Sequence, residues 1–82
     1  MDLDILIRNR DEALAAFNQA HKAELQAEED YYSVTGETWT LKRHTEVEAL
    51  LRAARQTWRE TIPTLLGTES DLARALKTLA GT

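Results

Sequence analysis

The chain has 82 residues, of which 43% are hydrophobic and 29% charged, and its formal net charge is −4. This composition excludes a disordered chain, and no apolar run approaches the roughly 20 residues of a membrane span. The absence of cysteine excludes disulfides and thiolate metal sites and favours a reducing cytoplasm. The acidic start indicates no secretory signal. A chain of this length builds a thin core, so we expect one small domain that is marginally stable or relies on partners.

Charge is distributed unevenly along the chain. Residues 1–38 hold three basic and nine acidic side chains, a net −6, whereas residues 39–62 hold five basic and three acidic, a net +2. Residues 63–82 are neutral. The two signs can pair within one molecule or between copies, and the sequence leaves both open. A net acidic chain is a poor candidate for non-specific DNA binding.

The first predicted element is a helix over about residues 4–30, with a start near Asp4 favoured over one near Asn9. Two neighbouring stripes run along this helix. The first stripe carries large side chains at helical spacing, namely Leu3, Ile7, Leu14, Phe17, His21 and Leu25. The second carries Ala13, Ala16, Ala20, Ala23 and Ala27. Because small residues let another helix approach closely, we expect the alanine stripe to be buried.

Residues 31–41 alternate with the two-residue period of a strand. A two-residue turn at Gly36–Glu37, where glycine can adopt a positive φ, folds this segment into a β-hairpin. One face of the hairpin then carries serine and threonine side chains. The other face carries the predicted packing residues Tyr32, Val34, Trp39 and Leu41.

The helical period returns over residues 42–62, with Thr40 as the N-cap. The apolar stripe of this helix consists of His44, Val47, Leu51, Ala54 and Trp58. Pro63 predicts the end of the helix, and a short amphipathic helix follows from Asp71 to about Ala80, ended by Gly81. The predicted fold is α+β and mostly helical: a helix–hairpin–helix core with antiparallel helices over 1–62, and a tail over 63–82.

The sequence predicts no catalytic, cofactor or metal site. His21 and His44 are single imidazoles on apolar stripes, where they more often pack at the edge of a core than bind a ligand. The chain also has no phosphate-binding glycine loop and no nucleophile elbow.

Three arginines of the second predicted helix, Arg52, Arg55 and Arg59, are the candidate charged interface. They form a solvated face with local ion pairs, or an electrostatic interface. That interface would contact DNA or the acidic first helix of a neighbour, where Glu24 and Glu28 lie. Leucines of the tail helix form a second candidate interface, namely Leu72, Leu76 and Leu79.

The run from Tyr32 to Thr40, followed by a helix with the late Trp58, resembles the hairpin of gpW-like head–tail joining proteins of tailed phages. The matching residues are Tyr32, Ser33, Val34, Gly36 and Thr40. Three positions depart from the pattern: Thr35 replaces a glycine, Glu37 a commonly basic residue and Trp39 an aliphatic one. The resemblance covers roughly residues 10–62.

This resemblance implies a structural protein of the virion neck, assembled in the host cytoplasm. It implies a ring of copies below the portal, as a dodecamer, from subunits that can be monomeric when free. The ring would close the DNA-filled head, with a passing contact to DNA, and dock the tail and neck proteins; no membrane is involved. The alternative is a small acidic helical binding module, such as a phage- or plasmid-encoded inhibitor. A third reading, a DNA-binding regulator, needs a more basic helix than residues 42–62 provide.

Overall fold

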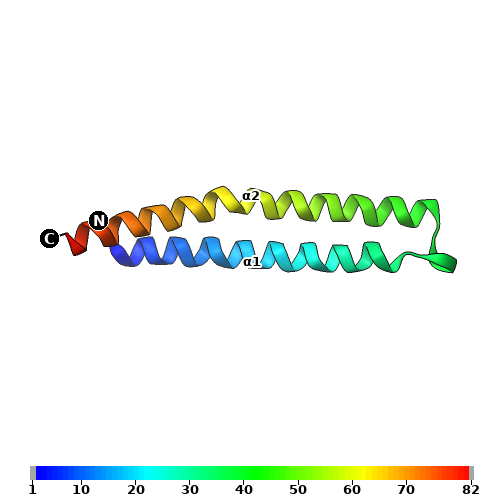
Figure 1. Ribbon diagram of the computed structural model, residues 1–82, viewed down its shortest axis with the longest axis horizontal. Coiled ribbons are helices and arrows are strands. Elements are labelled where there is room, and N and C mark those ends of the chain that lie inside the picture. Colours follow the sequence, from blue (N-terminus) through cyan, green and yellow to red (C-terminus); the bar gives the residue numbers. More distant parts are fainter. Residues whose placement is uncertain (1, 82) are drawn as a thin grey trace.

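The computed structural model describes residues 2–81, which form a long helical hairpin (Figure 1). Helix α1 spans Leu3–Ser33 and helix α2 spans Leu41–Ala80, and the short 3-10 turn η1, Gly36–Thr38, connects them. The hairpin measures 66 × 16 × 13 Å. Both chain ends lie at one end of this rod and η1 lies at the other (Figure 1). Met1 and Thr82, the outer bounds of the two predicted domains, lie outside the described residues.

The helix ends agree with the local signals in the sequence. The side chain of Asp2 caps α1 by accepting a hydrogen bond from the Asp4 N–H at 3.0 Å, which confirms a start near Asp4. Thr40 caps α2 as predicted, because its hydroxyl accepts from the Arg43 N–H at 3.0 Å. Gly81 ends α2 and donates its N–H to the Lys77 carbonyl at 3.0 Å.

The predicted β-hairpin is wrong, because residues 2–81 contain no strand. Tyr31–Ser33 extend α1 by another turn, and Thr35–Thr38 form a tight turn in which the Thr38 N–H donates to the Thr35 carbonyl at 3.1 Å. Gly36 does adopt the positive φ expected of it, at 55°. Two antiparallel helices that contact each other along their length need only a short connection. A β-hairpin over residues 31–41 would have no further strand to pair with, and an isolated hairpin is only marginally stable.

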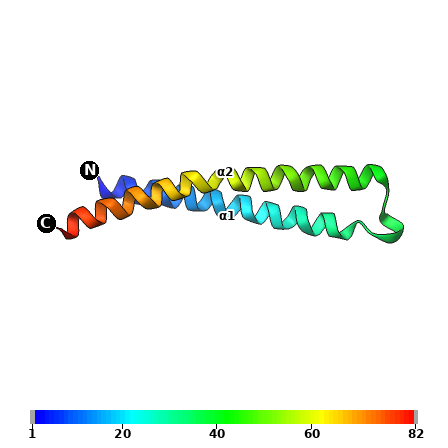
Figure 2. The ribbon, with the colours of Figure 1, turned by 45° about the horizontal axis from the view of Figure 1, so that its top comes forward.

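The predicted helix end at Pro63 is also wrong. Helix α2 runs through Pro63 without a break, so the short tail helix is the C-terminal half of α2. Proline lacks a backbone N–H and therefore destabilises the interior of a helix. Leu72, which follows it in α2, is buried, and this packing compensates for the cost of continuing the helix through Pro63. This half of α2 curves and crosses over α1 (Figure 2).

The contact between the helices follows a repeat of three and four residues, which is the pattern of a coiled-coil seam. On α2 this repeat places at the contact the residues His44, Val47, Leu51, Ala54, Trp58, Thr61, Leu65, Thr68, Leu72 and Ala75. On α1 it places there Leu3, Leu6, Arg10, Ala13, Phe17, Ala20, Glu24, Ala27 and Tyr31. Val47 is the most buried of them, with 1% of its surface exposed. The stripe predicted for α2 is therefore confirmed.

The outcome for α1 is split between its two predicted stripes. Ala13 and Ala20 of the alanine stripe are buried in the seam, as expected, whereas Ala16 and Ala23 are exposed. The large-residue stripe is divided between the seam, which includes Leu3 and Phe17, and the edge of the seam. Its Phe17 and His21 rings lie 5.7 and 4.8 Å from the Trp58 ring, but Leu14 and Leu25 remain exposed. The hairpin is therefore built on small α1 residues, and large apolar side chains are left beside the seam.

Candidate interaction face

The predicted charged residues meet within one molecule, at the side of the seam. Arg55 of α2 donates from Nη2 to Glu28 Oε1 at 3.0 Å and from Nε to Glu24 Oε1 at 3.5 Å. Glu24 is buried, whereas Arg55 and Glu28 are partly exposed. The structure thus brings together three of the predicted interface residues and uses them to join α1 to α2.

The ion-pair cluster of Arg55, Glu24 and Glu28 favours the charged form of its arginine. The hydrogen bond to Glu28 raises the pKa of the Arg55 guanidinium, burial partly opposes this, and Glu24 adds to the rise. Arg55 therefore stays protonated and supplies the positive charge that Glu24 needs in the seam.

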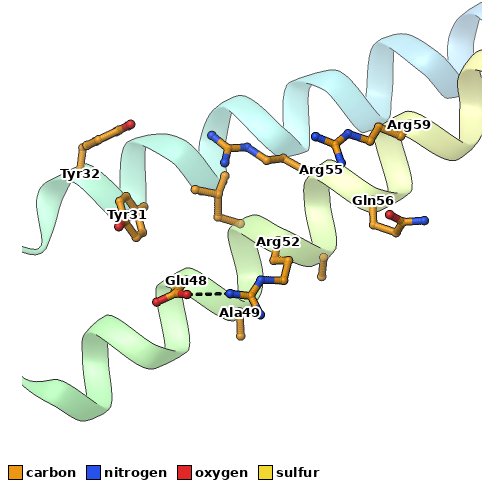
Figure 3. Close-up of a pocket in the computed structure, with 10 residues that line it drawn as sticks. Tyr31, Tyr32, Glu48, Ala49, Arg52, Arg55, Gln56 and Arg59 are labelled. Carbon is orange, nitrogen blue, oxygen red and sulfur yellow. Dashed lines mark hydrogen bonds and ion pairs between the residues drawn. The ribbon is translucent and has the colours of Figure 1, made fainter.

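The other two arginines behave differently from Arg55. Arg52 lies along α2 and donates from Nη2 to Glu48 Oε1 at 2.7 Å, which is a local ion pair of the kind expected on a solvated face (Figure 3). Arg59 extends alongside Arg55 from the same helix (Figure 3) and makes no ion pair within residues 2–81. An open groove of about 820 Å³ lies here, lined in part by these arginines and Tyr32.

The pair Glu28–Arg55 marks one side of the hairpin, and large apolar residues recur on that side along its whole length. Ile7 and Leu14 precede Glu28 by multiples of seven residues, and Leu25 and Tyr32 lie one turn from it, so all four share its side of α1. Ile62 and Leu76 follow Arg55 by multiples of seven, and Leu66 lies one turn beyond Ile62. We name as the apolar face the residues Ile7, Leu14, Leu25, Tyr32, Ile62, Leu66 and Leu76.

Most of the apolar face is uncovered. Leu14, Leu25, Tyr32, Leu66 and Leu76 are all exposed, and Tyr32 has 68% of its surface accessible. On the opposite side, the same seven-residue spacing gives mainly polar and small residues: Asn9, Ala16, Ala23 and Asp30 on α1, and Thr57, Thr64, Asp71 and Thr78 on α2. Leu50 and Ile5 are the large apolar residues exposed on that opposite side. The exposed apolar surface is therefore concentrated on one side.

The four predicted hairpin-packing residues do not form one packed face. Only Val34 is buried, and Trp39 and Leu41 join Tyr32 among the exposed residues of the tip. The aromatic rings still gather there, with Tyr31 at 5.6 Å and Trp39 at 5.9 Å from the His44 ring. His44 also lies 3.4 Å from Glu48 through Nε2.

The tail leucines divide between the seam and the surface. Leu72 is buried, whereas Leu76 and Leu79 are exposed. A second groove of about 470 Å³ lies at the open end of the hairpin, between Leu3 and Leu6 of α1 and Ala75 and Leu79 of α2.

The histidines lie where the sequence placed them, at the edge of the seam. His21 stacks on Trp58 and His44 packs among the tip aromatics. Within residues 2–81 no group of three or more His, Cys, Asp or Glu is arranged to hold a metal ion. Neither helix contains a stretch with the length and hydropathy needed to cross a membrane, over the same residues.

Sequence reasoning missed that Leu14, Leu25 and Leu66 belong to one surface with the arginines. The signal was present in their helical spacing from Glu28 and from Arg55, but the pairing of these two residues was needed to align the helices. Comparison with models of known protein families, with curated proteins and with solved structures finds no match. These comparisons neither support nor oppose the gpW-like resemblance, so the function is argued from the geometry.

Proposed function

We propose that this chain is a helical protein-binding module that acts by contact rather than by catalysis, with the apolar face as its binding surface. The observation that supports this proposal is the concentration of exposed leucine and tyrosine on one side of a hairpin whose other side is mainly polar. A concentration of exposed apolar residues on one side of a small chain is typical of a site that another protein covers. The arginines beside it give the surface charge contacts as well as apolar ones.

A photo-crosslinking amino acid tests this proposal in cells that express the protein. Placed at Leu25, on the apolar face, it is expected to give a discrete covalent adduct with a protein chain. The matched control is the same amino acid at Leu50, which is also an exposed leucine in a helix but lies on the opposite side. Equal labelling at both positions, or no adduct at Leu25, would contradict the proposal.

A phage head–tail connector is the second candidate and a narrower one. It is favoured by the Tyr32–Thr40 sequence and by helices of opposite net charge, which suit contacts between neighbouring copies in a ring. The fold agrees with the two antiparallel helices of the resemblance but lacks its β-hairpin. In this proposal the chain sits in the virion neck and contacts the portal and tail proteins.

Quantitative mass spectrometry of purified particles from the source phage tests the connector role. A constant amount near one portal equivalent is the expected result. Absence from clean, infectious particles would eliminate this candidate while leaving the binding module in place.

A further inference from the structure

The hairpin buries few side chains for its length. Within residues 2–81 the buried apolar residues are Ala13, Ala20, Val34, Val47, Leu51 and Leu72. Two helices in one layer can each cover only one side of the other, so residues beside the seam stay in water unless another layer is added. A chain with so small a core relies on further burial for its stability.

We propose that a second copy of this chain covers the apolar face and completes a four-helix bundle. The two-fold axis of this dimer runs along the length of the hairpins, so that both tips point the same way. The inference rests on the proposed function, because it names the partner of the same face.

The charges of the helices select this arrangement. Over its own residues α1 holds three basic and seven acidic side chains, a net −4, and α2 holds seven basic and five acidic, a net +2. An axis along the hairpin places each α1 beside the α2 of the other copy, so unlike charges meet. An axis across the hairpin places α1 on α1 and α2 on α2, so like charges meet.

The apolar residues also lie at matching heights in this arrangement. The contact of Phe17 with Trp58 sets the level of the two helices. Leu14 lies one turn before Phe17 and Ile62 lies one turn after Trp58, so both lie at one height on the apolar face. Facing copies related by the lengthwise axis therefore bring Leu14 of one copy to Ile62 of the other.

The whole side of the hairpin that carries the apolar face has the area of a specific dimer interface. Helix α1 is about 46 Å long at about 1.5 Å per residue. With the 16 Å width of the hairpin this gives roughly 700 Å² per copy, or about 1,500 Å² for the pair, which lies in the range of specific interfaces.

Molar mass in solution, measured by sedimentation equilibrium over a range of concentrations, tests the dimer. The wild-type chain is expected to have twice the monomer mass. Leu66→Glu, on the apolar face, is expected to weaken association by about tenfold or more, because the dimer would bury a carboxylate. The matched control is Leu50→Glu in the same helix, since these leucines are 63% and 58% exposed. It adds the same charge on the opposite side and is expected to leave the dimer intact.

The orientation of the copies is tested separately through the tip. The chain has no cysteine, so Glu37→Cys places one spin label in η1 of each copy. A lengthwise axis gives a label-to-label distance of about 20–30 Å across two neighbouring tips. A distance near the 66 Å length of the hairpin would show the crosswise arrangement and overturn the inference.

Two further outcomes separate the inference from the proposed function. A wild-type chain that is monomeric at all concentrations overturns the second copy as the partner. If crosslinking at Leu25 then still captures a different protein in cells, the binding module stands and only its partner changes. Dissociation by Leu50→Glu with no effect of Leu66→Glu would place self-association on the other side and overturn the inference. Circular dichroism of each variant confirms that the helices are retained.

Discussion

The two halves of this hairpin are equally helical but unequally packed. The tip half, residues 20–58, contains most of the buried positions, namely Ala20, Glu24, Val34, Val47 and Leu51. The open half, residues 2–19 and 59–81, contains Ala13 and Leu72. The tip half also holds the Arg55 cluster and the turn η1, which join the two helices.

The open half differs in what its seam contains. Threonines occupy seam positions 61 and 68, and Pro63 and Gly67 weaken the helix between them. Both halves are helical, but the open half is expected to be less stable, because the stability of a helix in a protein comes mostly from its packing. The open half also carries Leu14, Leu66 and Leu76 of the uncovered face, so it has the most to gain from a partner.

The largest expected effect comes from a seam leucine of the tip half. Leu51→Ala removes a buried side chain and is expected to lower the free energy of unfolding by about 3 kcal/mol. Leu72→Ala in the open half is expected to cost less, because the end of α2 can fray without loss of the rest. Urea unfolding at one fixed protein concentration measures both, and an equal or larger loss for Leu72→Ala would contradict the comparison.

The next effect strengthens the open half. Pro63 is exposed and lies in the interior of α2, so Pro63→Ala restores a backbone N–H without disturbing the seam. We expect a gain of about 2 kcal/mol, somewhat below the full difference between the two residues in a helix. Thermal unfolding followed by circular dichroism checks this, and a destabilised variant would show that Pro63 itself supports the path of α2.

Substitutions in the ion-pair cluster are expected to have a smaller effect on stability, and one that differs between Arg55 and Glu24. Arg55→Leu leaves Glu24 buried without its cation and is expected to destabilise the hairpin. Glu24→Leu leaves Arg55 paired with Glu28 and is expected to cost nothing or to stabilise, because it adds an apolar residue to the seam. Urea midpoints that rank the two variants in the opposite order would show that Glu24 itself stabilises the fold.

The same cluster is expected to contribute a stability that changes little as pH rises into the alkaline range. The pKa of Arg55 is raised in the folded state, so its contribution is fully present below the ordinary arginine pKa and is lost only as pH rises through the raised value. Stability from this group is therefore expected to be constant between about pH 6 and 9. Comparing urea midpoints of wild type and Arg55→Leu across that range checks it, and a difference that shrinks with rising pH would contradict it.

The smallest effect is at Gly67. Its backbone is helical and no atom lies near the position of an added Cβ, so Gly67→Ala is expected to add about 1 kcal/mol. The gain should appear as slower amide exchange in the open half. An unchanged exchange rate there would mean that Gly67 does not limit this part of α2.

Local signals predicted where each helix begins and that α2 ends at Gly81, but not that α2 continues through Pro63. Thr40 and Gly81 act through their own hydrogen bonds, so their roles could be inferred from sequence. Residues 31–41 have the alternation of strands, but Tyr31 packs against His44 and continues α1 instead. Pro63 was a sound stop signal that packing on both sides of it overrides.

The interaction face could be predicted only in part. The sequence identified the arginines of α2 and the acidic residues of α1, but it left open whether they pair within the molecule. Periodicity found two stripes on α1 but could not show that Leu14 and Leu25 of the large-residue stripe are exposed, because that depends on which residues α2 contacts. The Glu28–Arg55 contact resolves this and shows that Leu25 faces outward.

In the proposed dimer, a second copy covers the apolar face of a hairpin that is incomplete alone. Hydrogen exchange with mass spectrometry, repeated at increasing protein concentration, tests this most directly. We expect amides of residues 59–81 to become better protected as concentration rises, while those of residues 41–58 change less. Protection of residues 59–81 that is the same at every concentration would contradict it.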